Sequence, residues 1–80
     1  MDSVIPVYVV VDDGCEVNIF RSFEKLWEHI QRCVGTVEAR FEFAPFTEEN
    51  LRSIMKTELC VRLYLGGQRD WRYKIVKENV

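Results

Sequence analysis

The spacing of one histidine from one cysteine is the first feature of this sequence that could support chemistry. His29 and Cys33 are four residues apart, and on a helix that spacing places an imidazole beside a thiol, as two ligands of one metal ion. Cys15 and Cys60 could complete a ligand set, but no Cys-x-x-Cys pair occurs. We expect Cys15 in a hairpin turn and Cys60 on a strand face opposite buried leucines. These positions do not converge, so we predict no metal site and no cofactor.

The sequence also offers no set of residues that is typical of a catalytic site. A serine or cysteine nucleophile needs an adjacent base and an orienting group, and His29 is the single histidine, on the shoulder of an apolar helix stripe. The pairs Asp12-Asp13 and Glu48-Glu49 are typical of a turn and of a helix start. Gly66-Gly67 precedes a strand pattern and not a capped helix, which is unlike a phosphate-binding loop. We expect a protein that is not an enzyme.

Size and charge give the next constraints. The chain has 80 residues, 48% of them hydrophobic and 30% charged, which predicts a single globular domain over residues 1–80. Residues 1–61 carry six basic and eleven acidic side chains, a net charge of −5, whereas residues 62–80 carry five basic and two acidic ones, a net of +3. A charge asymmetry of this kind can orient a partner electrostatically.

Cysteine usage and hydropathy bear on the cellular compartment. Three widely spaced cysteines are unlike the disulfide framework of a small secreted domain. The apolar run 4–11 is too short to span a bilayer, and it lacks the basic start and cleavage site of a secretory signal. We therefore predict a cytoplasmic protein with no membrane partner.

The first half of the chain predicts a β-hairpin followed by a helix. Residues 4–11 are nearly all apolar and β-branched, which favours a central strand buried on both faces. Asp12-Asp13-Gly14 would turn the chain into a return strand over residues 16–20. Ser22 is a good N-cap and Gly35 a good C-terminal residue for the helix between them. The apolar stripe of that helix comprises Phe23, Leu26, Trp27, Ile30, Cys33 and Val34.

The second half predicts strand, helix, strand and strand. Residues 36–44 alternate, with Val37, Ala39, Phe41 and Phe43 expected on the buried side. Thr47 would cap a helix that ends near Thr57. Strands over 59–65 and 71–76 would flank a Gly66-Gly67 turn, with Trp71, Tyr73 and Ile75 facing inward. The order β-β-α-β-α-β-β predicts an α+β domain, a mainly antiparallel sheet with both helices on one face.

Such a fold leaves the other face of the sheet open, and we expect that face to bind any partner. The candidate binding residues are Arg40, Arg62, Tyr64, Arg69, Arg72 and Lys74. Basic residues around an aromatic on an open sheet are also how some RNA-binding modules hold bases and phosphates. Glu38 and Glu42 beside Arg40 would repel phosphates, which favours a solvated or protein-contact surface.

Residues 7–30 show a resemblance to a known group of proteins. An apolar strand, an Asp-Gly turn, the strand Glu-Val-Asn-Ile-Phe and the helix start Ser-Phe-Glu-Lys-Leu resemble small phage and mobile-element proteins, including anti-CRISPR inhibitors of bacterial defence. The resemblance implies an inhibitor that is encoded by a phage and acts in the host cytoplasm. It contains no diagnostic motif, so it assigns a role to no individual residue.

Three hypotheses of function follow. The first is a small non-enzymatic protein that binds a larger protein or complex and modulates or inhibits it. The alternative is a nucleic-acid-binding module that uses the open, partly basic face and binds less tightly as salt rises. A third is an assembly subunit, a homodimer formed through the final strand if that strand lies at an open edge.

Overall fold

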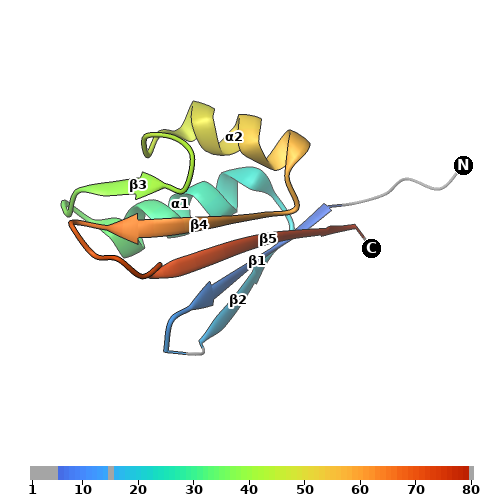
Figure 1. The fold of residues 1–80 in the computed structure, drawn as a ribbon. Coiled ribbons are helices and arrows are strands. Elements are labelled where there is room, and N and C mark those ends of the chain that lie inside the picture. Colours follow the sequence, from blue (N-terminus) through green and yellow to red (C-terminus); the bar gives the residue numbers. More distant parts are fainter. Residues whose placement is uncertain (1–5, 15, 80) are drawn as a thin grey trace, which may run out of the picture.

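The structure is a computed structural model that describes residues 6–14 and 16–79. The strands are β1 (Pro6–Asp12), β2 (Val17–Phe20), β3 (Ala39–Phe41), β4 (Cys60–Leu65) and β5 (Tyr73–Asn79), and the helices are α1 (Phe23–Val34) and α2 (Glu48–Thr57). The strands form one antiparallel sheet in the order β2-β1-β5-β4-β3. Both helices lie on the same face of this sheet (Figure 1). The predicted α+β fold and element order are confirmed.

Both helices begin and end where their capping residues predict. The Ser22 hydroxyl accepts a hydrogen bond from the Lys25 amide at 3.2 Å, and the Thr47 hydroxyl accepts one from the Asn50 amide at 3.1 Å. These bonds satisfy amides that have no partner within a helix. Gly35 closes α1 with a φ of 61°, a conformation that side chains with a Cβ avoid.

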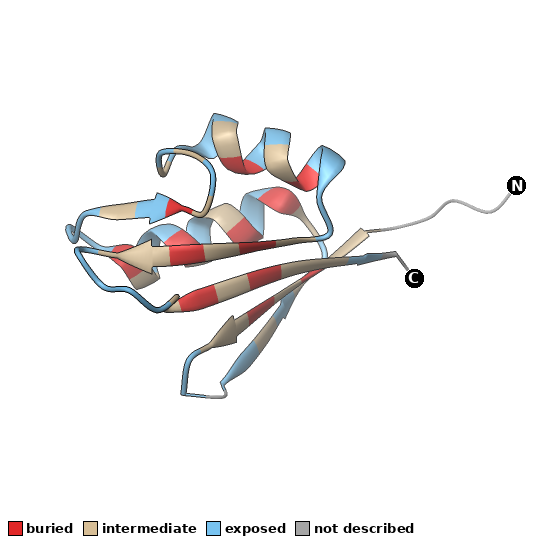
Figure 2. Ribbon diagram, viewed as in Figure 1, coloured by how far each residue is buried: buried red, intermediate tan, exposed pale blue. Residues whose placement is uncertain are grey.

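The core lies between the helices and one face of the sheet. The strand register aligns Val10, Ile75 and Val61 in one row, and all three are buried. The helices cover this row with further buried side chains, namely Leu26, Ile30, Leu51 and Met55. Figure 2 shows the resulting alternation of buried and half-buried residues along the central strands. Each such aliphatic side chain contributes about 1.5–3 kcal/mol by leaving water.

The strand predicted over residues 36–44 is much shorter than expected. The strand register with β4 covers only Ala39–Phe41, with one backbone hydrogen bond beyond each end, from Gly66 to Glu38 and from Glu42 to Arg62. Val37 and Phe43 are 52% and 69% exposed. The chain turns back directly after β3, because the Phe41 amide donates to the Ala44 carbonyl at 2.8 Å. Phe46 then occupies the space beside Phe41, with their ring centroids 5.3 Å apart. The burial predicted from the alternating pattern is therefore wrong on both sides of β3, at Val37 and at Phe43.

The two hairpin strands and the last strand also differ from expectation. β1 is central as predicted, but Val7, Val9 and Val11 are only half-buried, because both helices occupy the other face. Residues 4 and 5 of the predicted strand lie outside the described residues. β5 lies between β1 and β4, so the hypothesis of a homodimer through a final strand at an open edge is wrong. The edge strands are β2 and β3.

Smaller differences concern the ends of the last two strands. Leu59 precedes β4 and is 64% exposed, and Trp71 lies before β5 and is half-buried. Tyr73 and Ile75 are buried as predicted. Within the described residues, neither helix has the length and apolar character needed to cross a membrane.

Candidate functional site

The face of the sheet that the helices leave uncovered is the first candidate site. We call it the open face. Strand alternation and register place on it the side chains of Val7, Val9, Val11, Val17, Ile19, Arg40, Cys60, Arg62, Tyr64, Lys74, Val76 and Glu78. None of these residues belongs to the buried core. The open face divides into two chemically distinct halves.

One half is aliphatic. Register places Ile19, Val9 and Val76 side by side in a row across three strands, and Val17 lies opposite Val11 in the next row. We call these five residues the aliphatic half. Val17 and Ile19 are 54% and 64% exposed, and the other three are half-buried. Contiguous exposed apolar surface of this kind on a small domain marks interaction sites.

The other half is cationic and aromatic, and it contains four of the six residues predicted to bind a partner. The Arg40 guanidinium lies 4.4 Å from the centroid of the Tyr64 ring, and these two residues are register partners on β3 and β4. Arg62 pairs with Lys74 across β4 and β5, and its guanidinium is 3.4 Å from a Glu42 carboxylate oxygen. We call Arg40, Arg62, Tyr64 and Lys74 the cationic half.

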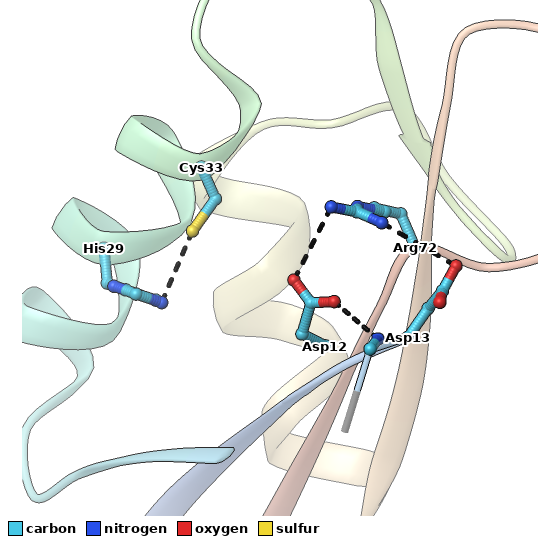
Figure 3. Close-up of polar contacts among 6 residues, drawn as sticks. Asp12, Asp13, His29, Cys33 and Arg72 are labelled. Carbon is cyan, nitrogen blue, oxygen red and sulfur yellow. Dashed lines mark hydrogen bonds and ion pairs between the residues drawn. The ribbon is translucent and has the colours of Figure 1, made fainter. Parts of the chain in front are cut away.

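The remaining two predicted residues lie elsewhere. Arg69 is in the exposed loop between β4 and β5. Arg72 is not on the open face: its guanidinium lies at one end of the sheet, 3.8 Å from an Asp12 oxygen and 3.7 Å from an Asp13 oxygen (Figure 3). Asp12 also accepts a hydrogen bond from the Gly14 amide at 2.7 Å. Arg72 thus joins the β1–β2 turn to the start of β5, a structural role that sequence alternation could not reveal.

The His29–Cys33 pair forms as the helical spacing predicts. The Cys33 sulfur is 3.4 Å from His29 Nε2, as Figure 3 shows, and the Phe20 ring stacks against His29 at 4.8 Å between centroids. Burial raises the pKa of the Cys33 thiol above its ordinary value of 9.0, because a thiolate loses its solvation there. The thiol is therefore protonated at neutral pH, whereas a nucleophile needs the thiolate.

The cysteines that could join this pair in a metal site are separated from it or undescribed. Cys60 lies on the open face, on the other side of the sheet from Cys33, and the expectation for Cys15 lies outside the described residues. Among residues 6–14 and 16–79, no group of three or more His, Cys, Asp or Glu side chains is arranged to hold a metal ion. Cys33 and Cys60 both carry free thiols.

A shallow cavity of about 250 Å³ opens between α2 and one end of the sheet. Two of its three cations already have partners. Arg52 lies 4.2 Å from the centroid of the Phe23 ring and 3.5 Å from a Glu48 oxygen, and the Lys77 ammonium donates to the Met55 carbonyl. The lining residues are Pro6, Tyr8, Phe23, Arg52, Met55, Lys56 and Lys77. The cavity therefore offers little free charge to a ligand.

Sequence reasoning missed the aliphatic half. The continuous apolar run of β1 predicted a strand buried on both faces, so its valines were not expected on an open face. Two facts together could have exposed the error. Five strands that share two helices on one face must leave the other face open, and valines at alternate positions of β1 must then lie on it.

Comparisons with protein-family models, with curated proteins and with solved structures find no match to this chain.

Proposed function

We propose that this protein binds a larger protein or complex through the open face and thereby modulates or inhibits it, without catalysis and without a cofactor. One observation carries the proposal: the aliphatic half and the cationic half are contiguous on a face that no element of the described chain covers. An apolar patch next to Arg and Tyr has the residue types in which protein interfaces concentrate their binding energy.

The charges of the open face indicate the chemistry of the partner. The cationic half presents Arg40, Arg62 and Lys74, and among the residues that the structure describes only Arg62 of these has a carboxylate partner, Glu42. An apolar ridge next to one or more acidic side chains would complement such a surface. Charge complementarity of this kind mainly accelerates association and selects the partner, while burial of the aliphatic half supplies affinity.

The resemblance of residues 7–30 to phage-encoded inhibitors makes a bacterial defence complex, in the host cytoplasm, the first class of partner to test. The protein would occupy a surface that the complex needs for its own substrate. It is expected to act stoichiometrically, because blocking by occupancy needs one inhibitor for each site.

Affinity capture with matched variants tests the proposal. Wild type, Val76→Lys and Tyr64→Ala are used as baits, and the retained proteins are quantified by mass spectrometry. Val76 and Tyr64 both lie on the open face away from the edge strand β2. The expected result is a stoichiometric partner that both variants lose by about tenfold or more. The purified partner must then bind the wild-type protein directly.

Val37→Lys is the control, because Val37 is 52% exposed but lies outside the strands. It should retain the partner as wild type does. A partner that survives Val76→Lys and Tyr64→Ala, with all variants folded by circular dichroism, contradicts binding through the open face.

Nucleic-acid binding is the second candidate, favoured by the stacked Arg40–Tyr64 pair on an open sheet. Such a pair could stack on a base while Lys74 contacts a phosphate. Fluorescence anisotropy with a single-stranded RNA of about 20 nucleotides would then show affinity that falls steeply between 50 and 200 mM salt. Arg40→Glu and Lys74→Glu should abolish it. Unchanged binding in both variants would reject this candidate.

A further inference from the structure

The outer edge of β2 carries backbone groups that point away from the sheet. The Asp12 amide donates to the Glu16 carbonyl at 2.8 Å, in register with the Tyr8–Phe20 pairing of β1 and β2. Hydrogen-bonded pairs alternate along an antiparallel ladder, so Asn18 and Phe20 bond to β1. The N–H and C=O groups of Val17 and Ile19 therefore point outward, and no strand of the described chain lies beyond them.

This edge lacks the features that normally prevent edge-to-edge pairing. The residues of β2 are Val17, Asn18, Ile19 and Phe20, which include no charge and no proline. Lysines, prolines, bulges and very short strands are the usual protection of an edge. The opposite edge has such protection: β3 is three residues long, and its Arg40 is bridged on the outer side by Pro45. The β3 edge of the sheet is therefore protected, and the β2 edge is open to a further strand.

We propose that two copies of this protein form a symmetric dimer by antiparallel pairing of β2 with β2. A twofold axis perpendicular to the sheet at Asn18 would place Val17 of each copy opposite Ile19 of the other. Both residues carry outward backbone groups, so the two strands would exchange hydrogen bonds directly. The aliphatic halves of the two open faces would then adjoin across the axis and form one apolar strip.

Self-pairing in this orientation also suits the flanking charges. Glu16 precedes β2 and Arg21 follows it. Antiparallel pairing centred on Asn18 places Glu16 of one copy opposite Phe20 of the other. A parallel in-register pairing would instead place Glu16 beside Glu16 and Arg21 beside Arg21. Like charges directly opposite each other are destabilising, so the ends of β2 favour the antiparallel over the parallel sense.

The dimer does not require the proposed function, although Val17 and Ile19 on β2 belong to both surfaces. It uses the backbone edge of β2, whereas the proposed binding of a larger protein uses side chains on β1, β3, β4 and β5 as well. A dimer would present two open faces on the same side of one extended sheet. An experiment can therefore reject the dimer without rejecting partner binding, and it can reject partner binding without rejecting the dimer.

Sedimentation equilibrium of the full chain over 5–500 μM tests the proposal. Wild type should show a concentration-dependent monomer–dimer equilibrium. Ile19→Pro removes an outward N–H without removing a bond to β1, a change that edge strands tolerate, and Ile19→Lys adds the charge that natural edges use. Each should weaken dimerisation by about tenfold or more, because every lost contact is lost twice in a symmetric dimer.

Leu59→Lys is the matched control for Ile19→Lys, since both residues are 64% exposed in the monomer. It should dimerise as wild type does. Circular dichroism of each variant separates a lost dimer from a lost fold. If Ile19→Pro proves unfolded, Ile19→Lys carries the comparison.

A cysteine at the axis tests the register. With Val17 and Ile19 hydrogen-bonded across the interface, Asn18 faces Asn18 of the other copy as a non-hydrogen-bonded pair, with Cα atoms about 4.5 Å apart. That separation suits a disulfide. Asn18→Cys should form a covalent dimer under mild oxidation far faster than wild type. A wild-type protein that stays monomeric at 500 μM, or a dimer that Ile19→Lys leaves intact, overturns the proposal.

Discussion

Phe41 and Phe43 occupy equivalent positions in the alternating sequence pattern but opposite environments in the folded chain. Phe41 is 1% exposed and packs in the core, whereas Phe43 is 69% exposed. We expect Phe41→Ala to lower the free energy of unfolding by about 3–5 kcal/mol, because it leaves a cavity. Phe43→Ala should change it by less than about 0.5 kcal/mol. Urea denaturation of the two variants gives the comparison, and equal losses would place Phe43 in the core after all.

The half-buried Cys33 thiol and the buried Tyr73 hydroxyl predict how stability depends on pH. Burial raises the pKa of the Cys33 thiol above its ordinary 9.0 and that of the Tyr73 hydroxyl above its ordinary 10.0. The unfolded chain therefore loses these protons at lower pH than the folded chain. Stability from both groups is fully present below pH 9.0 and falls as pH rises through the folded pKa values.

Thermal melts between pH 7 and 10.5 check this dependence. Ionisation of Cys33 and Tyr73 should leave the melting temperature unchanged up to about pH 9 and lower it at higher pH. Cys33→Ala should remove the first part of the decline and leave the part due to Tyr73. An identical alkaline profile for wild type and Cys33→Ala would show that the thiol does not contribute.

At the scale of elements, Gly35 and Gly67 differ in backbone conformation, because only Gly35 has a positive φ. Gly35 has a φ of 61°, and a Cβ there would meet nothing within 4 Å, so any cost of Gly35→Ala is conformational. We expect it to destabilise by about 1–3 kcal/mol. Gly67 has equal space but no positive φ, and Gly67→Ala should be within about 0.5 kcal/mol of wild type. Chemical denaturation measures both. Similar losses for the two would mean that backbone strain at Gly35 is not the cause.

The elements themselves were largely predictable from sequence because their signals are local. Ser22, Gly35 and Thr47 fix the helix boundaries through hydrogen bonds to neighbours a few residues away. The length of β3 was not predictable, since it depends on the turn that pairs Phe41 with Ala44 and on where Phe46 packs. Those contacts depend on tertiary packing, which an alternating pattern does not encode.

The candidate site was predictable only in part for a related reason. Arg40, Arg62, Tyr64 and Lys74 follow from strand alternation alone. The position of the Arg72 side chain at the end of the sheet, away from the open face, depends on its ion pairs with Asp12 and Asp13. The aliphatic half requires knowing which face the helices cover and which strands adjoin β1. Strand order is a non-local property, and no single segment carries it.

At the scale of the whole molecule, the strand order predicts a gradient of local stability. β5 and β1 are central and β2 and β3 are edges, so amide hydrogens of Val9, which bonds to β5, and of Ile75 should exchange slowest. The outward amides of Val17 and Ile19 should exchange quickly in dilute solution. Exchange followed by NMR at low and high protein concentration checks both statements. Slowing at Val17 and Ile19 alone on concentration would map the dimer edge, and uniform exchange across the sheet would contradict the gradient.

The central position of β5 also affects how the protein is made. β1 with β2 and β3 with β4 form two separate paired sets, and only β5 joins them. β5 follows every other strand in the chain, so during synthesis the two paired sets lack the strand that joins them until residues 73–79 have been made. The complete sheet can form only after that point. A ribosome that stalls before residue 73 would release a chain that lacks the middle of its sheet, a ready target for chaperones and proteases.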